Sequence, residues 1–158
     1  MKVIFLDVDG VLNSRKYILQ MDDLWDDPKN QMDPLAIARL NSITTQTGAN
    51  IVVSSTWRLA FKRNPDGLAP FFASYGIVAP VIGMTDDLVW DGLARKDEIA
   101  SWMDHNPVDN FVILDDETIT GFPGHDIKTT FDHGLMDHHV DMAVAILNSA
   151  PAVTPPIE

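Results

Sequence analysis

Near the start of the chain stands VIFLDVDGVLN, residues 3–13, in which four apolar residues lead directly into Asp7, Asp9 and a glycine. An apolar run of this kind is typical of a buried strand. Repulsion and desolvation both oppose two like charges at the end of such a strand. A partner at that strand end must therefore offset the cost, and its chemistry decides the expected function.

Composition predicts one soluble domain, residues 1–150, because the 158 residues are 46% hydrophobic and 22% charged. No apolar run approaches the roughly 20 residues of a membrane span, and no secretion signal is recognised. The chain has no cysteine, which excludes disulfides and thiolate metal sites and fits a cytoplasmic protein. We expect residues 151–158 to form a flexible tail.

The net charge is −12, from 11 basic and 23 acidic residues. Proteins that follow a nucleic-acid backbone normally carry a basic face. We therefore expect no duplex DNA partner, although a local basic pocket can still hold one phosphate.

Short runs rich in Val and Ile alternate with helical patterns along the chain. The predicted strands are 2–6, 50–54, 76–82, 110–114 and 126–130, and the predicted helices are 33–48, 68–75, one beginning near Arg95, and 137–147. Strands that alternate with helices predict an α/β fold with a parallel sheet and helices on both faces. Residues 14–32 show no clear period, so we expect a small insertion there, over the site.

Polar residues follow three of these strands, where an open parallel sheet binds its ligands. They are Asp7 and Asp9 at the end of the first strand, Ser54 and Ser55 at the end of the second, and Asp115 and Asp116 at the end of the fourth. Arg95 and Lys96 open the helix that precedes the fourth strand. Carboxylates from two strands suit a hard divalent cation, usually Mg²⁺. Mg²⁺ commonly bridges carboxylates and phosphate oxygens, so a phosphate ligand is expected as well.

The chain resembles the haloacid dehalogenase (HAD) superfamily in four features, which follow one another in the order of motifs I to IV of that superfamily. They are DVDGVL, a serine that closes a strand, a Lys/Arg before a helix, and ILDD. SSTWR, RKDEIASWM and VILDDE are also similar to the HAD domains of the Swiss-army-knife RNA-repair type. The resemblance implies a three-layer Rossmann-like HAD fold and a phosphatase.

The resemblance also implies a role for each aspartate. Asp7 would be the nucleophile that forms an aspartyl phosphate, and Asp9 the general acid and then the base. Asp115 would bind Mg²⁺ together with Asp7 and the backbone carbonyl of Asp9. Asp116 would be a further metal ligand or hold the ion in place.

Four assignments stay open at this stage. Ser54 and Ser55 compete for the phosphate-binding serine, with Ser55 favoured, and Arg95 and Lys96 compete for the motif cation. Arg58 either clamps a second phosphate or carboxylate of the substrate or pairs with a surface acid. Trp57 and Trp90 either stack on a base or pack against the protein.

The segments between the motifs are too short for a large cap domain, so we expect a minimal cap and an open site. The expected substrates are nucleotides or the terminal phosphates of nucleic acids. A small-metabolite phosphatase of the same chemistry is the first alternative. A non-catalytic module that binds a phosphate or a partner on the same scaffold is the second.

Overall fold

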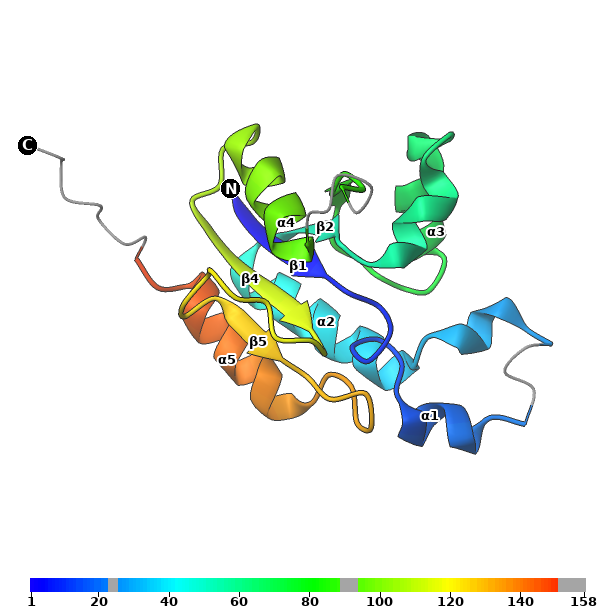
Figure 1. Ribbon diagram of the computed structural model, residues 1–158. Helices are drawn as coiled ribbons and strands as arrows, with labels where there is room; N and C mark the ends of the chain where they lie inside the picture. The colour runs from blue at the N-terminus through cyan, green and yellow to red at the C-terminus, as the bar shows by residue number, and fades with distance from the viewer. Residues whose placement is uncertain (23–25, 89–93, 151–158) are drawn as a thin grey trace, which may run out of the picture.

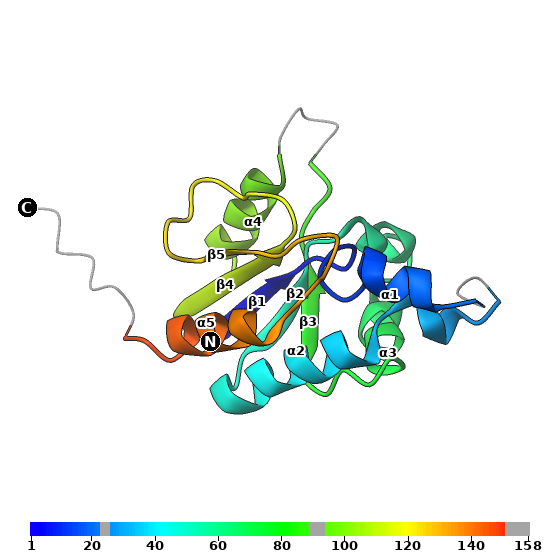
Figure 2. The same cartoon turned by 90° about the horizontal axis from the view of Figure 1, so that it is seen from below.

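A five-stranded parallel sheet with the order β3-β2-β1-β4-β5 forms the centre of the protein. The computed structural model describes residues 1–22, 26–88 and 94–150. The strands are β1 (Lys2–Leu6), β2 (Asn50–Val53), β3 (Val81–Met84), β4 (Asn110–Asp115) and β5 (Asp126–Lys128). Helices cover both faces of the sheet (Figures 1 and 2), which confirms the predicted three-layer α/β fold.

Each face of β1 packs against a different helical layer. Ile4 and Leu6 belong to one apolar cluster with residues of α2 (Pro34–Thr47) and α5 (Asp137–Leu147). Val3 and Phe5 belong to a second cluster, with Ile99 of α4 (Arg95–Asp104). All four strand side chains are fully buried, which explains why the strand reads as an unbroken apolar run.

Two connections, from β1 to α2 and from β2 to β3, contain short helical segments. Those in the first are α1 (Arg15–Gln20) and the 3₁₀ helix η1 (Pro28–Gln31). Those in the second are the 3₁₀ helices η2 (Thr56–Phe61) and η3 (Pro65–Gly67), followed by α3 (Leu68–Ala73). No helix of the described residues has both the length and the apolar composition that a membrane crossing needs.

The predicted strand 76–82 is wrong in its bounds, since β3 spans Val81–Met84. Gly76 has a φ of +94° and ends the turn after α3, and Val78 is 71% exposed. Pairing with β2 starts at the carbonyl of Pro80, which accepts from the Ile51 N–H at 2.9 Å. The apolar residues between Gly76 and Pro80 therefore belong to an irregular loop. The predicted tail, 151–158, lies outside the described residues.

Candidate active site

The register of the sheet brings the motif residues together. β1 lies between β2 and β4, and Leu6 pairs with Val53 on one side and Leu114 on the other. The Asp7 N–H continues this ladder by donating to the Leu114 carbonyl at 3.0 Å. Asp7 and Asp115 therefore leave two neighbouring strands at the same level.

Three carboxylates meet at this point. Asp7, Asp115 and Asp116 each offer an oxygen, and these oxygens all lie within 4.8 Å of one another. Opposite ligands of one Mg²⁺ are about 4.2 Å apart, given Mg–O bonds of about 2.1 Å. A cluster of oxygens at nearly this spacing fits a hard divalent cation.

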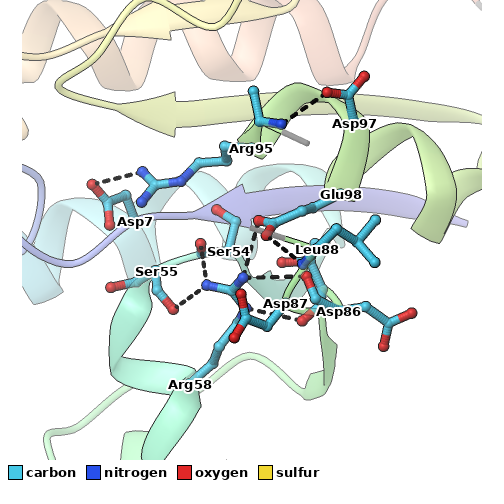
Figure 3. A network of polar contacts seen from close by, with 12 residues as sticks. Asp7, Ser54, Ser55, Arg58, Asp86, Asp87, Leu88, Arg95, Asp97 and Glu98 are labelled. Carbon is cyan, nitrogen blue, oxygen red and sulfur yellow. Dashed lines mark hydrogen bonds and ion pairs between the residues drawn. The ribbon is translucent and has the colours of Figure 1, made fainter. Parts of the chain in front are cut away.

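Arg95 is the cation that the structure brings to these carboxylates. Its Nη1 lies 3.3 Å from Asp7 Oδ2 (Figure 3) and 2.5 Å from Asp115 Oδ2. The Asp97 carboxylate accepts from the Ala94 N–H at 2.9 Å and caps α4, which holds Arg95 at the helix start. Lys96 is exposed. Arg95 thus takes the position for which both residues were candidates.

Arg95 does not fully offset the negative charge. Burial, followed by the neighbouring charge of Asp115, raises the pKa of Asp7 to about 7, although Arg95 acts in the opposite direction. Burial and Asp115 also raise the pKa of Asp116. Two carboxylates of the cluster therefore resist ionisation, which is the condition that a bound divalent cation relieves.

The turn after Asp7 is shaped around Asp116. Gly10 has a φ of +81°, and a Cβ at this position would lie 2.5 Å from Asp116 Oδ2. The buried Thr129 hydroxyl donates to the Gly10 carbonyl at 2.6 Å, and the Leu135 N–H donates to the Val11 carbonyl at 2.9 Å. Sequence reasoning missed this support from residues 129–135, because no motif marks it.

The two serines have different surroundings. The Ser55 side chain hydrogen-bonds to Asp7 and accepts from the Trp57 N–H at 3.3 Å. The buried Ser54 Oγ has no hydrogen-bond partner among the described residues. Ser55 is therefore the serine in contact with the candidate nucleophile.

Arg58 does not reach the carboxylate cluster. It is buried, and its guanidinium donates to the carbonyls of Ser54, Ser55, Thr85 and Asp86 and to the Glu98 carboxylate, at 2.9–3.2 Å (Figure 3). These five contacts use its five N–H groups. The expected pairing with a surface acid was wrong, because the acid that Arg58 contacts is the buried Glu98. The N–H groups of Arg58 are already used by these contacts, which leaves none for a substrate phosphate or carboxylate. Arg58 joins the loops after β2 and β3 to α4.

The Asp9 carboxylate is not part of the cluster of Asp7, Asp115 and Asp116. It accepts from Asn13 Nδ2 at 2.9 Å and from Trp57 Nε1 at 3.2 Å. Each oxygen of the Asp9 carboxylate thus has a side-chain donor outside the cluster. Trp57 also packs, with its ring centroid 6.2 Å from that of Phe71. Its bond to Asp9 was not predicted, and Trp90 lies outside the described residues.

A hollow of about 220 Å³ opens beside Arg95, lined also by Thr56, Leu59, Asp87 and Glu117 among others. A larger hollow of about 400 Å³ lies between α3 and β3 but includes no carboxylate of the cluster. The smaller hollow is not lined by these carboxylates either, but it is lined by Arg95, which contacts two of them, and the chemistry therefore points to it. Its size suits a phosphoryl group and a small part of the molecule that carries it.

Residues 3–140 match the model of a family described as the HAD domain in Swiss Army Knife RNA repair proteins. The match covers all of the candidate site residues. No curated protein and no solved structure matches the chain.

Gly10→Ala tests whether the turn positions Asp116. Both Gly10 and Gly48 have a positive φ, but a Cβ at Gly48 would meet nothing within 4 Å. We expect Gly10→Ala and Gly48→Ala each to lower the free energy of unfolding by about 1 kcal/mol or more. Only Gly10→Ala should weaken Mg²⁺ binding, by about 10-fold or more. Calorimetric titration measures this, and equal Mg²⁺ affinities for the two variants would contradict the assignment.

Arg58→Met tests the buried ion pair with Glu98, whose N–O distance is 3.0 Å. Loss of one partner leaves a buried charge, so the free energy of unfolding should fall by about 3–5 kcal/mol. The matched control is Lys62→Met, which removes a half-exposed lysine paired with Asp87 and should change stability by less than about 1 kcal/mol. Urea denaturation measures both, and similar small losses would show that the Arg58 network contributes little.

Proposed function

The chain belongs to the family of HAD domains in Swiss Army Knife RNA repair proteins, and on that premise we propose that it is a Mg²⁺-dependent phosphomonoesterase. The proposed substrates are nucleotides or terminal phosphates of nucleic acids. The observation that carries the proposal is the meeting of Asp7, Asp115 and Arg95 at the ends of β1 and β4.

The proposed reaction has two steps. An oxygen of Asp7 attacks phosphorus while the bond to the leaving oxygen breaks, which gives an aspartyl phosphate. The leaving oxygen keeps the electron pair and takes a proton from Asp9. Water then attacks the phosphorus, Asp9 accepts the water proton, and the Asp7 carboxylate is released. Ser55 hydrogen-bonds the phosphoryl oxygens in this scheme.

Positive charge at the site serves the same reaction. Held by Asp7, Asp115, Asp116 and the Asp9 carbonyl, Mg²⁺ would neutralise charge on the phosphoryl oxygens. Arg95 contributes further positive charge from the other side. It already contacts two of these carboxylates, so its guanidinium lies beside the place proposed for the phosphoryl group.

The choice of substrate rests on the family and on the size of the site. The family is described by its occurrence in RNA repair proteins. The hollow beside Arg95, about 220 Å³, favours a terminal phosphate on a molecule that extends into solvent. The net charge of −12 favours a short substrate over a long polyanion. We also propose a cytoplasmic location, because the chain contains no cysteine.

Asp7→Asn should lower phosphate release from 4-nitrophenyl phosphate by about 10³-fold or more, because the nucleophile is lost. A chelator should abolish wild-type release, and added Mg²⁺ should restore it.

Unfolding is not the expected cause of the loss of activity in Asp7→Asn. The pKa of Asp7 is raised to about 7, so its contribution to stability falls as pH rises toward that value. At pH 8 without metal, the neutral variant should be at least as stable as wild type. Unchanged turnover would contradict the assignment of Asp7.

A substrate panel tests the proposed specificity. It compares 3′- and 5′-mononucleotides and short RNAs with a terminal phosphate against sugar phosphates and other small esters. We expect kcat/KM for the nucleotide group to be higher by at least about 10-fold. The reverse order would favour the small-metabolite alternative, without affecting the chemistry.

A further inference from the structure

Both oxygens of the Asp9 carboxylate are held by side chains. Asn13 Nδ2 donates to Oδ1 at 2.9 Å, and Trp57 Nε1 donates to Oδ2 at 3.2 Å. A carboxylate has about four acceptor sites, so these two bonds leave one site free on each oxygen. The side chain is thereby fixed in direction while it can still carry a proton and face a substrate oxygen.

The network around Asn13 determines which way its amide points. Its Oδ1 accepts from the Gly10 N–H at 3.1 Å, so the NH₂ group must face Asp9. The same Nδ2 also contacts the Gln31 carbonyl at 3.3 Å. Asn13 is 6% exposed. Its donor to Asp9 is therefore held by Gly10 on one side and by η1 on the other.

Trp57 is held by a row of aromatic rings. Its ring contacts Phe71 of α3, and the centroid of Phe71 lies 5.4 Å from that of Tyr75. The Tyr75 hydroxyl donates to the Pro28 carbonyl at 2.7 Å. Pro28 and Gln31 are the two ends of η1. Asn13 and Trp57, the two donors to Asp9, are therefore both supported by η1, a short segment within residues 14–32.

We propose that Asn13 and Trp57 are positioning residues that aim Asp9 at the leaving oxygen, and that η1 braces both of them. This inference rests on the proposed function of Asp9 as the general acid. In a chain with a minimal cap, η1 thereby fixes the acid by hydrogen bonds and packing within the same domain.

The chemistry makes the positioning measurable. When the P–O bond breaks, an alkoxide leaving group must receive a proton from Asp9, whereas 4-nitrophenolate is stable without one. General acid catalysis typically contributes about 10²–10⁴-fold, so a loosely held acid loses part of that factor. The loss falls only on substrates with a poor leaving group.

Trp57→Phe removes the N–H and keeps a ring against Phe71. We expect kcat/KM to fall by about 10-fold for an alkyl phosphate and by less than about 3-fold for 4-nitrophenyl phosphate. We use kcat/KM because it reports on the steps up to formation of the aspartyl phosphate, so the later hydrolysis of that intermediate does not affect it. Trp102→Phe is the matched control, since Trp102 packs edge-on against Phe5 on the opposite face of the sheet. Trp102→Phe should leave the ratio of kcat/KM for the two substrates unchanged.

Tyr75→Phe tests the brace, because it removes only the hydroxyl that donates to Pro28. We expect a smaller loss than in Trp57→Phe, again confined to the alkyl phosphate. Equal losses for the two substrates, or no loss, in Trp57→Phe would overturn the positioning role. The same result in Tyr75→Phe would overturn the role of η1.

A measurement without catalysis separates this inference from the proposed function. Asp9→Ala should move the indole N–H resonance of Trp57 in the NMR spectrum, while the indole resonance of Trp102, on the opposite face of the sheet, stays in place. A Trp57 resonance that does not move would overturn the contact itself. If wild type released no phosphate while this resonance moved, the proposed function would fail and the contact would stand.

Discussion

The position of β1 between two parallel partners is the constraint on which the site depends. Leu6 pairs with both Val53 and Leu114, so the residues that follow these three positions emerge at one level of the sheet. Because the register of a strand buried on both faces is strongly specified, Asp7 and Asp115 meet even though they lie 108 positions apart in the chain. A shift by one residue would turn Asp7 toward the other face.

The same meeting point carries an electrostatic conflict that the fold only partly resolves. Arg95 contacts two carboxylates of the cluster, yet the pKa of Asp7 remains raised to about 7. Beneath the site, the buried Arg58–Glu98 pair ties the start of α4 to the loops after β2 and β3. Hydrogen bonds and ion pairs thus hold the charged side chains in place, and the excess negative charge of the carboxylate cluster is left for a cation to neutralise.

Sequence alone predicted those parts of the site that follow from strand order. Asp7 and Asp115 could be placed because parallel strands end at one edge of a sheet. Arg58 could not be assigned correctly, since its partners Thr85, Asp86 and Glu98 lie 27 to 40 positions further along the chain. The bond from Trp57 to Asp9 spans 48 positions and depends on how η2 turns after Ser55. The bounds of β3 failed for a local reason, because Pro80 and the exposed Val78 interrupt an apolar run.

A crystal structure of the protein grown with Mn²⁺ in place of Mg²⁺ tests the central claim most directly, because Mn²⁺ can be located by its anomalous scattering. The account predicts one ion between β1 and β4, about 2.0–2.3 Å from oxygens of both Asp7 and Asp115. An ion bound elsewhere, or none at these carboxylates at saturating Mn²⁺, would contradict it.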